Sequence, residues 1–167
     1  LPAQMMKAWS ACVPNFINSY GPTEAAVDVT AARCKPDMAH PHSIGSPLNN
    51  VRAYIVDPGD PAVLLPPGVP GELVVSGEQI GRGYRNLPEL TAKSFINNPF
   101  ERDSDSPHAR MYRTGDLCRW LPDGTLGYMG RIDQQIKLRG LRIELGEIEN
   151  VLLQHSSVEA CAVSLVG

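Results

Sequence analysis

Hydrophobic residues recur first at helical spacing and then, on either side of a polar turn, at the spacing of short strands. Residues 2–12 predict a short amphipathic helix, because apolar side chains stand near one helical face at Met5, Met6, Trp9 and Cys12. Strands are expected over 16–19 and 25–32, with the turn signal Gly21-Pro22 between them. Residues 31–50 are rich in proline, histidine and asparagine and predict a loop.

Short strands and turns fill the middle of the chain. Alternation predicts a strand over 51–57, and PPGVPGELVVSG (66–77) is a turn that leads into another strand. MYRTGDLCRWLPDGTLGYMGR (111–131) predicts a hairpin, since its turn Pro-Asp-Gly has proline at the first corner and glycine where a left-handed conformation is needed. The charged segment 101–108 predicts a surface loop. Strands at this spacing favour a small antiparallel sheet or barrel.

The pattern changes close to residue 131. IKLRGLRIE (136–144) predicts a second hairpin, and ELGEIENVLLQH (144–155) predicts a helix with acidic residues in its first turn. The apolar stripe of that helix consists of Leu145, Ile148, Val151 and Leu152. A last strand is expected over 158–166, so that a β–β–α–β subdomain would begin near residue 133.

Composition and charge narrow the function classes. The 167 residues are 43% hydrophobic with a net charge of −3, which is typical of a soluble globular chain and gives no basic surface for nucleic acid. No apolar run approaches the roughly 18–20 residues of a membrane helix, and we expect no signal peptide. The four cysteines form no C-x-x-C pair, which favours reduced thiols in the cytoplasm. Because the chain starts without methionine and stops in an apolar run, we expect it to be a piece of a longer polypeptide.

Two short segments carry candidate chemistry. SYGPTE (19–24) places a phenol, a hydroxyl and a carboxylate at a turn, which suits a ligand site but also an ordinary polar loop. TGD (114–116) places Asp116 behind a glycine. A carboxylate there can accept two hydrogen bonds from a vicinal diol such as ribose, although aspartate in this position also serves as a turn residue.

Cations gather in the C-terminal part of the chain, at Arg131, Lys137, Arg139 and Arg142. Such a density of positive charge can bind phosphate. The alternative is a solvent-exposed face that the glutamates of the following helix neutralise. No Ser/His/Asp set and no H-E-x-x-H motif supports a hydrolase or a zinc protease.

The order of these segments is more specific than any one of them. SYGPTE, then GELVVSG followed by GRGY, then YRTGDL and GRIDQQIKLRGLRIELGEIE resemble the adenylation domains of nonribosomal peptide synthetases over most of residues 15–153. The resemblance implies a mixed α/β fold and an ATP-dependent ligase that converts an amino acid to aminoacyl-AMP with release of pyrophosphate. The phosphopantetheine thiol of a carrier-protein domain would then take the acyl group as a thioester.

The resemblance also implies three regions. Residues 1–48 would end the α/β nucleotide-binding core, 49–132 would form a β-rich, barrel-like subdomain, and 133–167 would begin a mobile C-terminal subdomain. The phosphate loop of the family would lie upstream and its catalytic lysine downstream. These residues alone are therefore expected to be inactive.

Residue roles are implied in the same way. The nucleotide would be contacted by Asn18, Tyr20, Gly21, Thr23, Asp116, Tyr128 and Arg131, with Tyr20 stacked on adenine and Asp116 bound to the ribose hydroxyls. Thr23 and Glu24 would be catalytic, and Glu24 would hold Mg²⁺. Asp133 would be the hinge of the moving subdomain. The pantetheine tunnel would include Arg139 and Gly140, the turn of the second hairpin.

Three residues bear on the substrate: Ser19, Val27 and Asp28 match positions that line the amino acid pocket in adenylation domains. A buried Asp28 would need a hydroxyl or a cation as partner, and a similar Val-Asp pair in serine-activating domains points to serine. Two alternatives stay open, an acyl- or aryl-CoA ligase of the same superfamily and a non-catalytic docking remnant.

Overall fold

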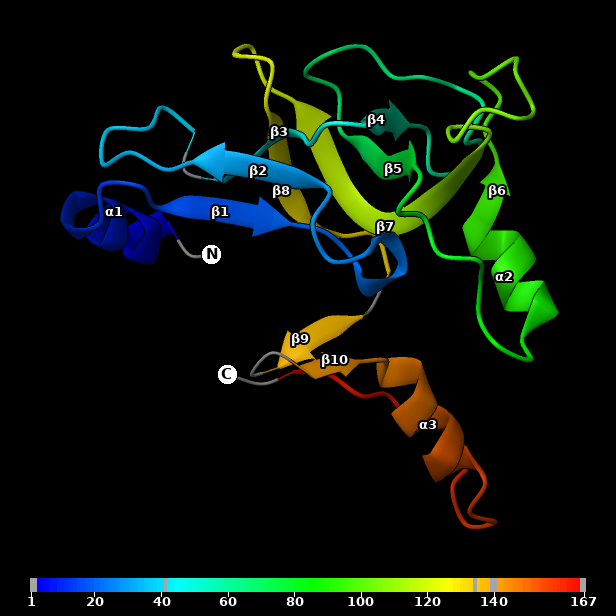
Figure 1. The fold of residues 1–167 in the computed structure, drawn as a ribbon. Helices are drawn as coiled ribbons and strands as arrows, with labels where there is room; N and C mark the ends of the chain where they lie inside the picture. Colours follow the sequence, from blue (N-terminus) through cyan, green and yellow to red (C-terminus); the bar gives the residue numbers. More distant parts are fainter. Residues whose placement is uncertain (1–2, 41, 134, 139–140, 166–167) are drawn as a thin grey trace. The chain divides into compact units, whose positions relative to one another are not determined.

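The chain folds into two compact units, residues 1–130 and 131–167 (Figure 1). A computed structural model describes residues 3–40, 42–133, 135–138 and 141–165. Helices and an antiparallel sheet occur together, which confirms the mixed α/β class.

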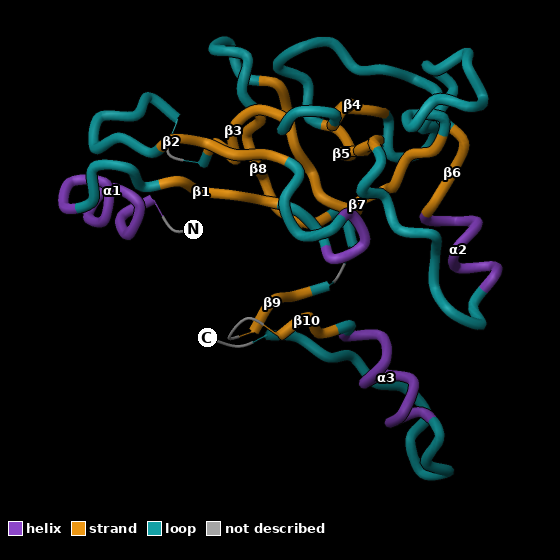
Figure 2. Tube along the Cα trace, in the orientation of Figure 1, coloured by secondary structure: helices purple, strands orange, loops and turns teal. Residues whose placement is uncertain are grey.

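The first unit is built on one sheet with the strand order β1-β2-β3-β8-β7-β5-β4, and β6 also pairs with β7 (Figure 2). Its strands are β1 (Ile17–Tyr20), β2 (Thr30–Arg33), β3 (Ser43–Pro47), β4 (Val51–Val56), β5 (Gly71–Gly77), β6 (Phe95–Asn97), β7 (Arg110–Trp120) and β8 (Leu126–Arg131). Among the described residues β1 and β4 end this order without pairing with each other, so the sheet is open. The barrel that the strand spacing favoured does not close.

β5 lies in the middle of the hydrophobic core. All seven of its residues are buried, as expected for a strand covered on both faces. Leu73 and Val75 join a cluster on one face that includes Ile55 and Leu126, whereas Val74 packs into a smaller cluster on the other face. The alternation of period two along β5 therefore fills two separate apolar layers.

The α-helices of the described residues are α1 (Ala3–Cys12) and α2 (Pro88–Ser94) in the first unit and α3 (Leu145–Leu153) in the second. In the second unit, β9 (Ile136–Leu138) and β10 (Leu141–Ile143) pair antiparallel and form the predicted hairpin. Its turn, Arg139 and Gly140, lies outside the described residues. Residues 158–165 form no strand, so the prediction of a last strand there is wrong for the part that the structure describes.

Two predictions between residues 25 and 50 are also wrong. Residues 25–29 do not extend β2, because the 3₁₀ turn η1 (Thr23–Ala25) is followed by Ala26 and Val27 at φ 53° and 75°. Within the expected loop, β3 forms beside β2. Gly45 makes this close pairing possible, since a Cβ there would lie 1.9 Å from the Ala31 carbonyl oxygen. The helix α2 and the strand β6 were not predicted from the sequence.

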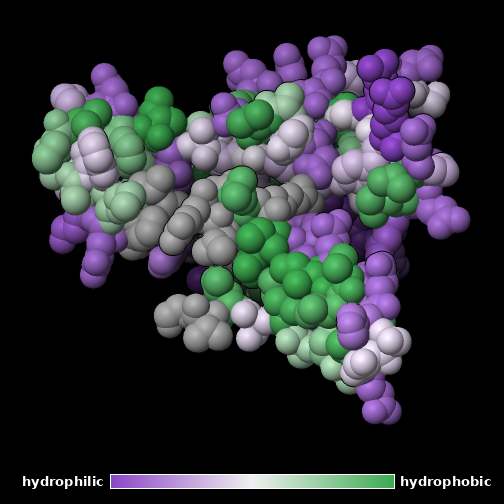
Figure 3. Space-filling model, turned by 90° about the horizontal axis from the view of Figure 1, so that it is seen from below, coloured by the Kyte–Doolittle hydropathy of each residue, from purple (hydrophilic) through white to green (hydrophobic). Residues whose placement is uncertain are grey.

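The apolar stripe of α3 is largely exposed within the second unit. Leu145 is 8% exposed, but Ile148, Val151 and Leu152 are 42%, 65% and 43% exposed. Figure 3 shows hydrophobic side chains gathered on the face that includes α3. The stripe is present as predicted, although the described residues of this unit do not bury it.

Candidate functional site

A tight turn at residues 21–28 ends β1 and directs the chain back into β2. The amides of Ala25 and Val27 both donate to the Pro22 carbonyl oxygen, each at 3.1 Å. Gly21 is required at this point, because a Cβ on it would lie 2.2 Å from the Val27 carbonyl oxygen. The turn therefore places Tyr20 at the end of β1.

A bulge in β7 carries Asp116. The β5–β7 pairing shifts between Glu72 and Val74, so that residues 114–116 of β7 face Leu73 alone. Across the bulge, the Thr114 hydroxyl donates to the Leu73 carbonyl oxygen at 2.7 Å, and the Asp116 amide donates to the Thr114 hydroxyl at 3.0 Å. The glycine between them has φ +68°, a left-handed conformation that favours glycine. The bulge thus explains the sequence TGD.

The turn and the bulge bring two distant side chains together. The Tyr20 hydroxyl donates a hydrogen bond to Asp116 Oδ2, although the residues are 96 positions apart. Asp116 is only 7% exposed. Burial, and next the charge of Asp116, raise the pKa of Tyr20 far above its ordinary range, which favours the protonated hydroxyl that donates to Asp116. Burial and the same charge also raise the pKa of Cys118.

The ring of Tyr128 on β8 completes this group. Its centroid lies 6.2 Å from that of Tyr20, and the two planes are inclined at 45°. Asn18, two residues before Tyr20, donates from its amide to the Ser43 carbonyl oxygen at 3.2 Å. The structure therefore gathers a carboxylate and two aromatic rings from β1, β7 and β8, with Asn18 on the same strand as Tyr20.

Glu24 is held by the segment that follows β5. The Tyr84 hydroxyl donates to Glu24 Oε1 at 2.8 Å, and the Gly81 amide donates to the Glu24 carbonyl oxygen at 2.8 Å. Burial, and then the hydrogen bond to Glu24, raise the pKa of Tyr84. Thr23 is exposed. No role was predicted for Tyr84 from the sequence. It is the last residue of GRGY, one of the segments that resemble adenylation domains.

Arg131 and Asp133 form a pair within the second unit. The guanidinium donates from Nε to Asp133 Oδ1 at 2.9 Å and from Nη2 to Oδ2 at 2.5 Å. The Gln135 amide also donates to Asp133 Oδ1, at 3.1 Å. The residue predicted to be the hinge is thus held by a bidentate contact to a residue predicted to contact the nucleotide.

Comparison with known proteins decides the family. The sequence profile described as AMP-binding enzyme matches residues 1–85. The chain belongs to the AMP-binding enzyme family.

Similar proteins cover most of this AMP-binding chain. Tyrocidine synthase 2 of Brevibacillus parabrevis is 52% identical over 151 residues, which are 89% of this chain and 4% of that protein. Bacitracin synthase 3 of Bacillus licheniformis is 50% identical over 160 residues, which are 96% of this chain and 2% of that protein. The chain thus spans a small part of the length of these relatives.

The fold of this chain is similar to that of a solved structure. The structure of PA1221, described as an NRPS protein containing adenylation and PCP domains, aligns with a TM-score of 0.82 and 27% identity. The alignment covers 97% of this chain and 32% of that one. Among the described residues of the AMP-binding chain, no helix is long and apolar enough to cross a membrane.

The residues expected in the amino acid pocket lie at the surface of the AMP-binding chain. Ser19 and Asp28 are exposed, and Val27 is 61% exposed. Serine is expected only if Asp28 is buried, and the described residues leave Asp28 exposed. Arg139 and Gly140, expected in the pantetheine tunnel, lie outside the described residues.

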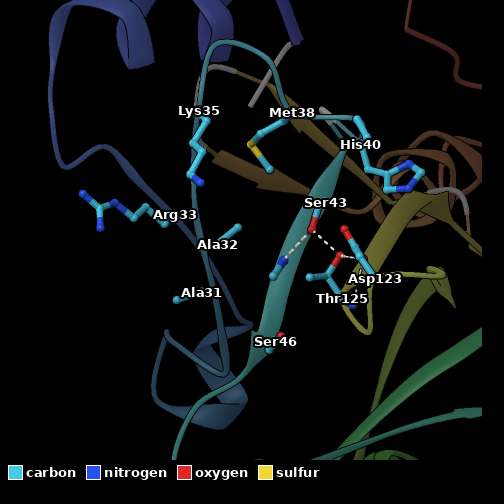
Figure 4. A pocket seen from close by; sticks show the side chains of 12 residues that line it. Ala31, Ala32, Arg33, Lys35, Met38, His40, Ser43, Ser46, Asp123 and Thr125 are labelled. Carbon is cyan, nitrogen blue, oxygen red and sulfur yellow. Dashed lines mark hydrogen bonds between the residues drawn. The ribbon is translucent and has the colours of Figure 1, made fainter.

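A cavity of about 370 Å³ lies between β2, β3 and the β7–β8 turn (Figure 4). On one side Ser43 and Thr125 share a hydrogen bond of 2.9 Å, and Thr125 donates to Asp123 at 2.7 Å. The Thr125 hydroxyl is the main cause that lowers the pKa of Asp123. These polar groups bond one another, which indicates that they stabilise the hairpin turn.

Proposed function

We propose that this chain is part of an amino-acid adenylating ligase of nonribosomal peptide synthesis. The proposed reaction joins an amino acid carboxylate to the α-phosphate of ATP, giving aminoacyl-AMP and pyrophosphate. The acyl group then passes to the phosphopantetheine thiol of a carrier domain. Support comes from peptide synthases about 50% identical to this chain and from the likeness to a structure described as containing adenylation and PCP domains.

The single observation that carries the proposal is the contact between Tyr20 and Asp116. A carboxylate can accept hydrogen bonds from the two ribose hydroxyls of a bound nucleotide, and such charge-assisted bonds are strong. Asp116 is buried and already accepts one hydroxyl, that of Tyr20. In the proposed complex the ribose hydroxyls bind Asp116, the ring of Tyr20 stacks on adenine, and Asn18 contacts the adenine edge. Tyr128 and Arg131 are proposed to contact the ribose.

Glu24 and Thr23 are proposed to act at the phosphates. Mg²⁺ commonly binds one or two protein carboxylates together with substrate phosphates and water, and Glu24 supplies one carboxylate, oriented by Tyr84. The ion, when bound, offsets negative charge on the phosphate oxygens. Thr23 is exposed beside Glu24 at the start of η1, where its hydroxyl can donate to a phosphate oxygen.

Asp133 is proposed as the hinge between adenylation and thioester formation. Hinges are short segments that absorb backbone rotation, and the division between compact units lies two residues before Asp133. Arg139 and Gly140 are proposed to contact the pantetheine arm. We expect the protein to act in the cytoplasm, and serine is the amino acid to test first.

The test is amino-acid-dependent exchange of pyrophosphate into ATP by a complete protein that carries this sequence. The common amino acids, fatty acids and aryl acids would each be supplied as substrate, with Asp116→Ala as the variant. Exchange with one amino acid, lost in the variant, is the expected result. Exchange with fatty or aryl acids alone would make the protein a CoA ligase. No exchange by a folded, complete protein would favour a docking remnant.

A further inference from the structure

Glu72 is a buried carboxylate to which the proposed reaction assigns no role. It is 3% exposed, and both of its oxygens are engaged. Oε1 accepts the Gly115 amide at 3.1 Å, while Oε2 accepts Arg113 Nε at 2.9 Å and Nη2 at 2.5 Å. Arg113 Nη2 also donates to the Pro58 carbonyl oxygen at 2.8 Å. A buried charge needs such partners, and here they lie in the strand immediately before Asp116.

The bond to Gly115 acts directly on the backbone from which Asp116 extends. Peptide groups are planar, so fixing the Gly115 amide fixes the Thr114–Gly115 peptide plane, which is one peptide group before the one that leads into Asp116. Gly115 is at φ +68°, and glycine is the residue with the most backbone freedom to lose. If Glu72 did not accept the Gly115 amide, no carboxylate of β5 would hold the backbone of the bulge at this residue.

We propose that Glu72 is a positioning residue that holds the Asp116 carboxylate in place for the ribose hydroxyls of the nucleotide. Glu72 sets the bulge through Gly115 and Arg113, and Thr114 closes it from the other side through Leu73. The inference rests on the proposed role of Asp116. It adds that ribose recognition depends on a second carboxylate that does not contact the nucleotide.

The test compares the affinities of AMP and 2′-deoxy-AMP, measured by titration calorimetry on a complete protein that carries this sequence. The ratio of the two dissociation constants reports recognition of a ribose hydroxyl without any catalytic step. Glu72→Gln keeps the size of the side chain but replaces one acceptor oxygen by an NH₂ group. This donor group would face either the Arg113 guanidinium or the Gly115 amide, which are donors themselves. Thr114→Val keeps the shape of the Thr114 side chain and removes the hydroxyl that donates to the Leu73 carbonyl oxygen. Glu101→Gln is the matched control, because Glu101 also pairs with an arginine, Arg52, at 2.8 Å, and that arginine side chain is 51% exposed.

AMP should bind the unchanged protein at least about tenfold more tightly than 2′-deoxy-AMP, since hydrogen bonds to charged groups are strong and directional. Glu72→Gln and Thr114→Val should each remove most of this preference, and Glu101→Gln should keep it. In a protein that already carries Asp116→Ala, adding Glu72→Gln should change the ratio no further. This lack of additivity would show that Glu72 acts through Asp116.

A folded Glu72→Gln variant that keeps the full preference for AMP would overturn the positioning role of Glu72. If Glu72→Gln does not fold, as judged by circular dichroism, Glu72→Asp carries the test, because it keeps the charge but shortens the side chain that reaches Gly115 and Arg113. A preference that survives Asp116→Ala would instead show that Asp116 does not bind the ribose, which separates failure of the proposed function from failure of this inference.

Discussion

Replacing Tyr20 by phenylalanine isolates the hydrogen bond at the centre of the site. The change keeps the ring, which faces Tyr128, and removes only the hydroxyl that donates to Asp116. Because Asp116 is 7% exposed, its lost bond is not fully replaced by water. A hydrogen bond to a charged group contributes about 1.5–3 kcal/mol, so we expect Tyr20→Phe to lower the free energy of unfolding by about 2 kcal/mol at pH 7.

The pH dependence gives the same prediction a second readout. The folded-state pKa of Tyr20 is raised by burial and by Asp116. The protonated Tyr20 hydroxyl therefore contributes its full share to the stability of the folded state below the unfolded pKa of about 10. This contribution is lost as the pH rises above that value. Urea unfolding of the wild type should thus show stability falling more steeply above about pH 10 than in Tyr20→Phe.

The control is Thr30→Val, which removes a buried hydroxyl that donates to the Ile44 carbonyl oxygen at 2.6 Å. This neutral bond contributes about 0.5–1.5 kcal/mol, so its loss should be smaller than that at Tyr20. A Tyr20→Phe variant as stable as the wild type, with an unchanged profile above pH 10, would refute the reasoning.

Three further changes test how the fold holds the site. Gly21→Ala places a Cβ 2.2 Å from a backbone oxygen and should cost more than about 2 kcal/mol in urea unfolding, whereas Gly146→Ala, which meets nothing within 4 Å in α3, should stabilise by up to about 1 kcal/mol. Leu73→Ala, at a fully buried position, should cost about 2–5 kcal/mol, against less than about 0.5 kcal/mol for Leu64→Ala, which is 51% exposed. Asp123 has a lowered pKa, so its stabilisation is present above the unfolded pKa of about 4 and is lost as the pH falls below it. Asp123→Asn should therefore make unfolding less sensitive to acid, and equal sensitivity in the two proteins would contradict the assigned cause.

Alternation, turn residues and helical spacing correctly predicted several helices and strands. The strands β4 and β5, the β7–β8 hairpin and α1 follow from alternation, turn residues and helical spacing. The strand β3 was missed because its formation depends on the close approach of Gly45 to Ala31 across the sheet. Nothing in the proline- and histidine-rich sequence around β3 signals that pairing. The left-handed Ala26 and Val27 were missed because residues of these types rarely adopt positive φ.

The candidate site shows a similar division. Resemblance to adenylation domains selected Tyr20 and Asp116, but the hydrogen bond between them joins positions 96 residues apart and needs the fold. The bulge at residues 114–116 and its contact with Glu72 also needed the strand register, because a bulge is a property of two paired strands. The apolar face of α3 was visible in the sequence, whereas what covers such a face cannot be inferred from its period.

A structure of a complete protein that carries this sequence, determined with bound AMP, would test the central claim most directly. The distances to measure join the ribose O2′ and O3′ atoms to the carboxylate oxygens of Asp116. We predict at least one distance of about 2.5–3.0 Å for each hydroxyl, with the Tyr20 hydroxyl displaced from Oδ2 and its ring against the adenine. Ribose hydroxyls bound elsewhere, with the Tyr20–Asp116 hydrogen bond intact, would contradict the account.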